Sequence, residues 1–538
     1  MLRKRIYIIR ITVIAFKTWI YDQIQEPLFS NIHLWLLFTI TVFFVFNHTK
    51  KSKPNSMNLP PSPPKLPFIR NLLQLGTLPH LSLLNLSKTY GDIMMLQLGQ
   101  RPNPTLVVSS AELAKEIAKN YDLVFSNRPQ NTATKILLYG ATDVGFGLYG
   151  DDWRQKRKIC VLQLLSTRRV QSFRAIREEE VEEMVRVLVR ASSNEEAVNL
   201  GEMVVSSSNN IVCKCALGRK YGEEGGIQDL ARRVMIYLTA FTVGDYFPAL
   251  GWVDVVSGKI GRYRETFRTL DGLFDKVIEE HKMAKKEESD GDGSNNKKDL
   301  VDVLLGIQED AAMVDGEYKL TNNDIKSLLM DMFVAGTDTT SATIEWAMTR
   351  LVQNPEIMKK IQEEVRRVVR CNNSSKVEEN HINQMQYFKC VVKETLRLHP
   401  PCTVLPPRET MAHVKLNGFD IPAKTMVLTN AWAIQRDPKL WERPEEFMPE
   451  RFEKSEIDFN GDQWFEFLPF GYGRRGCPGV FFGVAIVEYV LASLLYWFDW
   501  KLPENVSSGH DIDMSEEYGL VVSKKVPLHL KPIAHVRA

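Results

Sequence analysis

The residues best suited to chemistry lie near the C-terminus, in the sequence FGYGRRGCPG at positions 470–479. Its glycines let the backbone turn tightly and approach a flat ligand closely. Pro478 suits the first turn of a helix, which we expect to run from Gly479 to about Trp497. The Cys477 sulfur would then lie at a helix N-terminus, where free amides favour the thiolate, a good ligand for iron. The alternative is a glycine-rich turn with an inert cysteine.

This segment resembles the cysteine loop, FxxGxRxCxG, of the cytochrome P-450 superfamily. The resemblance implies that Cys477 is the axial ligand of a haem b iron, whose thiolate donates electron density that favours O–O cleavage. It also implies that Arg475 binds a haem propionate. The positions that match the pattern, and that would contact the cofactor, are Phe470, Gly473, Arg475, Cys477 and Gly479.

A long helix is predicted from Asp324 to Gln353. Thr321, with Asp324 three residues later, has the pattern of a capping box at its start, and Pro355 marks its end. At 1.5 Å per residue such a helix is roughly 45 Å long and could cross the whole domain. Its middle contains AGTDTT, residues 335–340, a cluster of poor helix formers that predicts a local opening.

The AGTDTT segment resembles the oxygen-activation motif of the superfamily. The resemblance assigns Asp338 and Thr339 to a relay of protons toward the oxygen, and Gly336 to making space above the haem. Proton delivery is chemically reasonable, since O–O cleavage consumes protons that a dry pocket does not hold. The alternative is that the threonine hydroxyls only bond back to carbonyls of the helix.

Glu394 and Arg397 stand three residues apart on one predicted helix face, and Arg451 follows in the sequence FMPERF, residues 447–452. These residues resemble the ExxR and PERF elements of the family. The resemblance implies that Glu394, Arg397 and Arg451 form a buried charge network behind the haem, with a structural role. Taken alone, such a pair is more often a solvated surface contact.

Further basic residues resemble haem-propionate contacts of the family. Trp153 and Arg157 have the spacing of its WxxxR helix, and Arg408 follows two prolines. The resemblance implies that all three bind the cofactor. We also expect a basic face for an acidic electron donor, with salt-sensitive turnover; ordinary solvated surface charge is the alternative. The residues of this basic face are Lys156, Lys158 and Arg474.

The composition describes a large globular protein. Of 538 residues, 44% are hydrophobic and 25% are charged, so the chain can bury a large core. The net charge of +2 gives no support for a nucleic-acid partner. The seven cysteines include no CxxC pair and no zinc-finger spacing, so we expect reduced thiols that face the cytosol. Beyond about residue 70 nothing resembles a linker, which favours one catalytic domain, residues 71–538.

The N-terminal part predicts attachment to a membrane. Residues 28–49 are long and apolar enough for an anchor helix, and lysines follow rather than a cleavage site; a cleaved signal peptide or a buried helix is the alternative. Residues 1–27 form a basic extension, which could be one arm of a helical hairpin, a surface-lying helix or the product of a mispredicted start codon. Residues 50–70 form a basic and proline-rich hinge that should act as a stiff spacer.

The rest of the chain has a mainly helical pattern, with one amphipathic run over residues 176–189. Short strands are expected at 94–98, 105–108 and 426–429. The stretch 282–299 is charged and rich in Gly, Ser and Asn, so we expect an exposed loop between helices.

From about Leu59 onward the chain is similar to the plant microsomal A-type group of the superfamily. The implied fold is mainly α, a helical prism with a small β-rich region, and an N-terminal membrane anchor precedes it. Haem would lie between the cysteine loop and the helix predicted over 324–353, which we call the oxygen helix. One departure is Arg70, where relatives carry a glycine, and it could alter the packing of the hinge. The segments implied to face a small lipophilic substrate are 125–148, 237–247, 328–336, 403–405 and 518–521.

The resemblance implies a haem-thiolate monooxygenase that inserts one oxygen atom of O2 into a plant specialised metabolite. Electrons would come from NADPH through NADPH-cytochrome P-450 reductase, with cytochrome b5 as a second donor. The protein would be a monomer in the endoplasmic reticulum membrane, with its catalytic domain facing the cytosol. Two alternatives stay open: a haem-thiolate dehydratase, isomerase or oxidative coupling enzyme, and a non-catalytic haem-binding sensor. The dependence of substrate conversion on NADPH, reductase and O2 discriminates between them.

Overall fold

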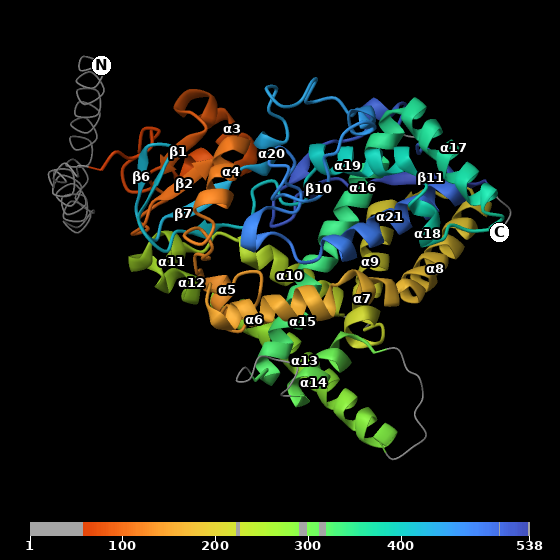
Figure 1. Ribbon diagram of the computed structural model, residues 1–538, viewed down its shortest axis with the longest axis horizontal. Coiled ribbons are helices and arrows are strands. Elements are labelled where there is room, and N and C mark those ends of the chain that lie inside the picture. Colours follow the sequence, from red (N-terminus) through yellow and green to blue (C-terminus); the bar gives the residue numbers. More distant parts are fainter. Residues whose placement is uncertain (1–56, 222–225, 290–297, 311–318, 505, 536–538) are drawn as a thin grey trace, which may run out of the picture. The chain divides into compact units, whose positions relative to one another are not determined.

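The computed structural model describes residues 57–221, 226–289, 298–310, 319–504 and 506–535. These form a mainly helical domain with small sheets, as predicted (Figure 1). The longer helices are α3 (Pro79–Tyr90), α4 (Ala111–Asn120), α6 (Asp151–Ile159), α8 (Arg174–Ser193), α9 (Leu200–Leu217), α10 (Ile227–Thr239), α13 (Lys259–Ser289), α14 (Leu300–Glu309), α15 (Asn322–Gly336), α16 (Asp338–Gln353), α17 (Pro355–Cys371), α19 (Gln386–Leu398) and α21 (Val480–Trp497). The shorter helices are α5 (Thr132–Leu137), α7 (Thr167–Ser172), α11 (Val243–Tyr246), α12 (Trp252–Val256), α18 (Glu379–Ile382) and α20 (Ala431–Ile434).

The main sheet has the strand order β1-β2-β7-β4. β1 and β2 are antiparallel, whereas β2 and β7 are parallel, with Thr105 opposite Met426. Every residue of β1 and β2 is buried, which explains their continuous apolar sequences. The three predicted strands are confirmed to within two residues. The strands are β1 (Ile93–Leu96), β2 (Thr105–Val108), β3 (Val198–Asn199), β4 (Arg408–Glu409), β5 (Val414–Leu416), β6 (Phe419–Ile421), β7 (Met426–Thr429), β8 (Phe498–Lys501), β9 (Glu516–Glu517), β10 (Ser523–Lys524) and β11 (His529–Ala534).

The helix predicted over 324–353 is interrupted in the structure. α15 begins after Thr321, whose hydroxyl accepts a hydrogen bond from the Asp324 amide at 3.2 Å, while the Asp324 carboxylate accepts one from the Thr321 amide at 2.9 Å. This confirms the capping box, and α16 ends before Pro355 as predicted. The predicted local opening is confirmed, because regular helix stops at Thr337, within the cluster of poor helix formers.

Helix α21 leads from the cysteine loop into the core. It begins at Val480 with Gly479 as its N-cap residue, one position later than predicted. Ile486, Val490 and Leu494 are fully buried or nearly so, and the helix packs against α8, α16 and α17. Among the described residues it is the only unbroken helix that is long and apolar enough to cross a membrane. Its burial among other helices identifies it as a core helix instead.

The N-terminal predictions fall partly outside the described residues, where both the anchor 28–49 and the extension 1–27 lie. The proline-rich segment, however, does not stand apart as a spacer. The compact catalytic unit begins at Leu59, not at residue 71, and the Met95 amide of β1 donates a hydrogen bond to the Pro61 carbonyl at 2.8 Å. Backbone pairing with the sheet therefore draws this segment into the domain.

Arg70 has a backbone φ of 55°. This is the left-handed region, which glycine adopts freely and other residues adopt at a cost of about 1 kcal/mol. Its backbone bridges to Leu66 and Leu98. A glycine would suit this conformation better than an arginine does. Arg70 therefore adds strain to the turn, although its backbone bridges to Leu66 and Leu98 still form.

The predicted run 176–189 lies within α8 and is confirmed as helical. The predicted loop 282–299 is too long at its start, because α13 continues to Ser289. Lysines and glutamates dominate that stretch, and they favour helix as well as exposure. Residues 290–297 lie outside the described residues, and Asp299, the last residue of the predicted loop, caps α14 with its side chain. All seven cysteines are free, as predicted.

Candidate active site

The cysteine loop is shaped by two glycines and closed by a backbone hydrogen bond. Gly471 and Gly473 have φ values of 70° and 65°, a conformation that favours glycine. At Gly473 a β-carbon would also lie 2.3 Å from an oxygen of Asp122. The Cys477 amide donates to the Phe470 carbonyl at 2.8 Å. The loop therefore has no room for larger residues at its turn.

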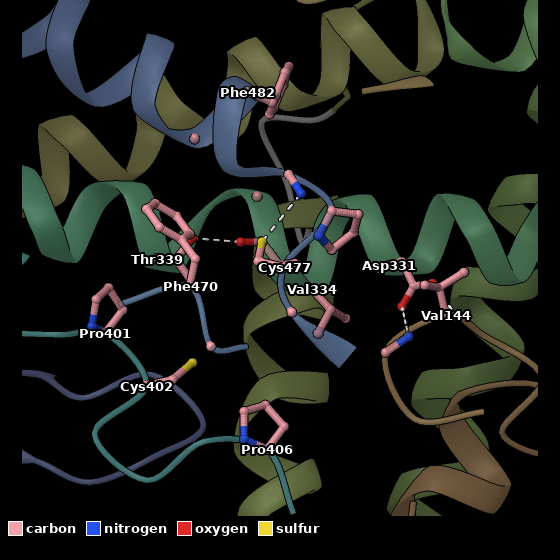
Figure 2. Close-up of a pocket in the computed structure, with 18 of the residues that line it drawn as sticks. Val144, Asp331, Val334, Thr339, Pro401, Cys402, Pro406, Phe470, Cys477 and Phe482 are labelled. Atoms are coloured by element: carbon pink, nitrogen blue, oxygen red, sulfur yellow. Dashed lines mark hydrogen bonds between the residues drawn. The ribbon is translucent and has the colours of Figure 1, made fainter. Parts of the chain in front are cut away.

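The Cys477 sulfur faces an interior cavity (Figure 2). The residue is accessible to solvent, yet protein surrounds it, so its open surface is turned toward the cavity. Burial raises the pKa of the Cys477 thiol, opposed by a hydrogen bond from the Gly479 amide at 3.3 Å and by Arg157. The start of α21 therefore does not ionise the thiol by itself, contrary to the expected effect of a helix N-terminus. A bound metal cation would ionise it.

The cavity next to Cys477 has a volume of about 270 Å³ and a predominantly apolar lining. Four of the five segments expected to face substrate contribute to it. The prediction for 237–247 was wrong, since none of these residues, all of them described, lines the cavity. Helix α10 instead contributes Met235, two residues before that segment.

Arginine side chains gather at the cavity wall. They donate mainly to backbone carbonyls, for example from Arg157 to Gly476 at 2.6 Å. Burial, together with the neighbouring arginines, lowers the pKa of Arg475 to about 9 and that of Arg128 well below its ordinary value. So much positive charge in apolar surroundings is suited to an anionic ligand. The arginines are Arg128, Arg157, Arg408 and Arg475.

Arg128 was missed by the sequence analysis, which placed it only within a segment facing substrate. Its neighbours in the sequence, Ser126 to Thr132, are mainly polar, so the local pattern does not distinguish it from a surface arginine. Trp153 also lines the cavity, but its indole N–H donates to the Val144 carbonyl at 2.9 Å. Its ring lies under the Arg475 guanidinium, 4.1 Å from the ring centre. Trp153 is therefore placed to orient Arg475.

These features fit an iron porphyrin. Three cysteines line this largely apolar cavity, Cys160, Cys402 and Cys477, and Cys477 is the most exposed of them, as a ligand of the iron must be. Four arginines line the same cavity, of which Arg128, Arg408 and Arg475 are buried and Arg157 is half-buried, and their charge is opposite to that of the two propionates of haem b. The lining also includes the turn residues Phe470, Gly476 and Gly479, whose close backbone leaves space for a flat ring.

Glu394, Arg397 and Arg451 lie together. Glu394 and Arg397 are completely buried and form a bidentate pair with distances of 2.7 and 2.9 Å. The Arg451 Nε atom lies 3.1 Å from the same carboxylate. The alternative of a solvated surface pair is therefore wrong. Arg397 also donates to the backbone carbonyls of Gln435, Pro444 and Glu446.

The interrupted helix α15–α16 presents Gly336 and Thr339 to the cavity. A β-carbon at Gly336 would lie 2.9 Å from a methyl group of Val212 on α9, so glycine permits close packing there. The Thr339 hydroxyl donates to the Ala335 carbonyl at 2.7 Å, the arrangement of the alternative interpretation. Asp338 is not among the lining residues, and burial raises the pKa of its carboxyl, with Arg232 opposing.

Lys156 does not belong to a basic surface, so that prediction was wrong. Its side chain is 1% exposed and lies 2.6 Å from Asp324 at the start of α15. Helix α6 turns this position inward, which the local charge pattern does not reveal. Lys158 is exposed, and so is Arg474, which pairs with Asp122 at 3.1 Å.

Residues 60–531 match the family described as Cytochrome P450. Over 524 residues the chain is 50% identical to phenylacetaldehyde oxime monooxygenase CYP71AN24 of Prunus mume, an overlap of 96% of this chain and 97% of that protein. It is 43% identical to costunolide synthase of Cichorium intybus over 495 residues, 92% of this chain and 97% of that one.

The fold is similar to that of a zebrafish cytochrome P450 solved with abiraterone. The TM-score is 0.69 at 24% sequence identity, over 86% of this chain and all of that one. A second zebrafish structure, solved with progesterone, has a TM-score of 0.70 at 23% identity and covers 85% of this chain and 99% of that one. Since the family match spans nearly the whole described domain and full-length relatives are plant proteins, the chain belongs to the cytochrome P450 family, in its plant A-type group.

Proposed function

We propose that this protein is a monooxygenase that inserts one atom of O2 into a small, largely apolar plant metabolite. Electrons come from NADPH through NADPH-cytochrome P450 reductase. The observation that carries the proposal is Cys477, whose sulfur opens into an apolar cavity that the interrupted helix α15–α16 also lines. A thiol in that position suits an oxygen-activating haem better than a purely structural one.

Haem b, the cofactor of the family, supplies the activation of O2 when bound, and a thiolate ligand favours O–O cleavage. Cys477 would hold the haem iron through its sulfur, and Trp153 orients Arg475. Gly473 and Gly479 would let the loop backbone approach the cofactor, and Phe470 would contact it. The charged partners of the propionates are Arg128, Arg157, Arg408 and Arg475.

Protons reach the cavity through the interruption of the oxygen helix. Asp338 lies directly after the break and holds its proton more tightly than an exposed carboxyl, because burial raises its pKa. The adjacent Thr339 lines the cavity, and its hydroxyl donates to the Ala335 carbonyl, so its oxygen is free to accept from a substrate or water. Gly336 leaves the space for these groups. Glu394, Arg397 and Arg451 stabilise the fold without taking part in the reaction.

The cavity lining supports a small and mostly apolar substrate. Hydrophobic side chains such as Val334, Leu405 and Val521 dominate the wall. Phenylacetaldehyde oxime is the first compound to test, since the relative of 50% identity is named for acting on it.

We also propose that the domain rests on the endoplasmic reticulum membrane, facing the cytosol. Trp252 and Val256 on α12 are 62% and 78% exposed. The neighbouring α11 segment meets residues before β1, because the Phe247 ring stacks on Phe68 at 4.9 Å. Leu73, in the segment before β1, is also 67% exposed. Large exposed apolar side chains on neighbouring segments are typical of a membrane contact.

The first test is the absorption spectrum of the reduced, CO-bound protein. The wild type should show the red-shifted Soret band of thiolate-ligated haem, and Cys477→Ser should lose it. Cys371→Ser, which changes an exposed cysteine at the end of α17, is the matched control and should keep the band. A folded wild type without the band would contradict the assignment of Cys477.

The second test is conversion of substrate in microsomes that contain the protein and its reductase. Conversion that requires both NADPH and O2 supports monooxygenation. Conversion that needs neither NADPH nor O2 would instead indicate a dehydratase or isomerase. A change of the haem spectrum on substrate binding, without any conversion, would favour a sensor.

A further inference from the structure

The loop that precedes α6 forms part of the cavity wall through Val144 and Phe146. Side chains from elsewhere in the chain hold each carbonyl of this loop, at distances from 2.5 to 3.2 Å. The bonds run from Trp153 and Arg475 to Val144, from Arg128 to Gly145, from Gln130 to Phe146, and from Arg475 to Gly147.

Two carboxylates hold the amides of the same loop. Asp331 on α15 accepts hydrogen bonds from the Val144 amide at 2.7 Å and from the Gly145 amide at 3.3 Å (Figure 2). Asp143 accepts one from the Phe146 amide at 2.7 Å. The loop is thus bound to the arginines by its carbonyls and to the oxygen helix by its amides.

These two carboxylates are neighbours. A β-carbon placed on Gly145 would lie 3.2 Å from an oxygen of Asp143 and equally far from an oxygen of Asp331. Asp143 is completely buried, and its Oδ1 atom has no hydrogen-bond partner among the described residues. Asp331 is partly exposed, toward the cavity that it lines. Two carboxylates side by side inside a protein repel each other when both are ionised, and a single proton between them removes the repulsion. The unpartnered oxygen is where such a proton would be held.

The surrounding charges agree with one proton on the pair. Burial raises the pKa of Asp331 well above its ordinary value, and Asp143 raises it further. Burial also raises the pKa of Asp143, while hydrogen bonds and Arg475 oppose this. A pair with one proton carries a single negative charge, which complements the arginines. The charged and titratable groups that face the pair are Arg128, Arg157, Arg475 and Cys160.

We propose that Asp143 and Asp331 share one proton, and that this carboxyl pair positions loop 144–147 against α15 and so sets the shape of the substrate cavity. Both are positioning residues: Asp143 acts through the loop, and Asp331, which also lines the cavity, holds the amides of the loop. Only the predicted effect on substrate binding rests on the proposed function, whereas the shared proton and the position of the loop do not. As the pH rises and the shared proton is lost, the two charges repel and the loop loosens.

The experiment is hydrogen–deuterium exchange of the full-length, haem-loaded protein, read at the amides of 144–146 and corrected for intrinsic exchange at each pH. Between pH 7 and 9.5 the wild type should lose about tenfold or more of its protection. Asp143→Asn should keep its protection across this range, because the amide N–H replaces the shared proton. Asp229→Asn, which changes an exposed carboxyl at the start of α10, should behave as the wild type does.

Asp331→Leu removes both acceptors and should lose protection at every pH, with a raised KM and unchanged kcat. A wild type whose protection is constant with pH, or an Asp143→Asn variant that loses protection in parallel with the wild type, would overturn the shared proton. If Asp331→Leu does not fold, the comparison of wild type with Asp143→Asn still decides. The amide readout is independent of turnover, so a failure of the proposed monooxygenation would be recognised separately.

Discussion

Replacement of Arg397 by methionine should remove much of the stability of the domain. Glu394 would be left fully buried, with only the Met448 amide at 2.9 Å and Arg451 at 3.1 Å as partners. Loss of one partner of a buried ion pair costs about 3–5 kcal/mol, because the remaining charge is not solvated. A typical folded domain has a free energy of unfolding of about 5–15 kcal/mol, so this loss is a large share of it.

The backbone carbonyls add to the expected cost. Arg397 donates to Gln435 at 2.9 Å, to Pro444 at 2.8 Å and to Glu446 at 3.2 Å. Methionine supplies no donor, and a buried acceptor without a partner costs about 1–3 kcal/mol. The double variant Glu394→Gln with Arg397→Met should recover part of the loss, because it no longer strands a charge.

The assay is thermal unfolding of the purified protein, followed by far-ultraviolet circular dichroism and by the Soret absorbance. The matched control is Arg443→Met, since Arg443 and Glu446 have the same spacing but are 53% and 57% exposed. An exposed pair contributes at most about 1 kcal/mol. Equal midpoints for Arg397→Met and Arg443→Met would refute the reasoning that burial makes the difference.

Three further predictions follow from burial and close contact. Burial raises the pKa of Glu488 from 4.5 to about 7, so its ionisation destabilises the fold as the pH rises through this range. Glu488→Gln should therefore stabilise the protein by up to about 3 kcal/mol at pH 8 and by less than about 1 kcal/mol at pH 5. Equal gains in the free energy of unfolding at both pH values would contradict this. Gly473→Ala should reduce the haem content per protein, because its β-carbon would lie 2.3 Å from a carboxylate oxygen, whereas Gly91→Ala, with a φ of 92° but nothing within 4 Å, should keep its haem. Lys156→Met should cost about 2 kcal/mol in thermal unfolding by stranding Asp324, yet leave the salt dependence of turnover as in the wild type, since Lys156 is buried.

The features predicted correctly from sequence depend on short stretches of chain. The capping box at Thr321 and Asp324 is set by hydrogen bonds that span three residues. The turn that carries Cys477 needs glycines at fixed neighbouring positions, so its spacing alone identifies it. The strands β1 and β2 were visible as continuous apolar runs, because both of their faces are buried.

The interruption of the oxygen helix could be predicted only in part from the sequence. Poor helix formers around Thr337 predicted an opening, but propensity alone does not say whether a helix bends or breaks. Close packing of Gly336 against α9 accompanies the break. That contact joins segments that are far apart in the sequence, so the local pattern does not contain it.

By itself the sequence determined the identity of the cysteine loop, the caps of the helices and the mainly helical class, because each of these depends on neighbours along the chain. Only the tertiary structure decided that Lys156 is buried, that Arg128 joins the other arginines, and that Asp143 meets Asp331. The physical reason is that burial and charge coupling depend on which distant elements pack together, and the same residue types on a different face would be solvated surface charges.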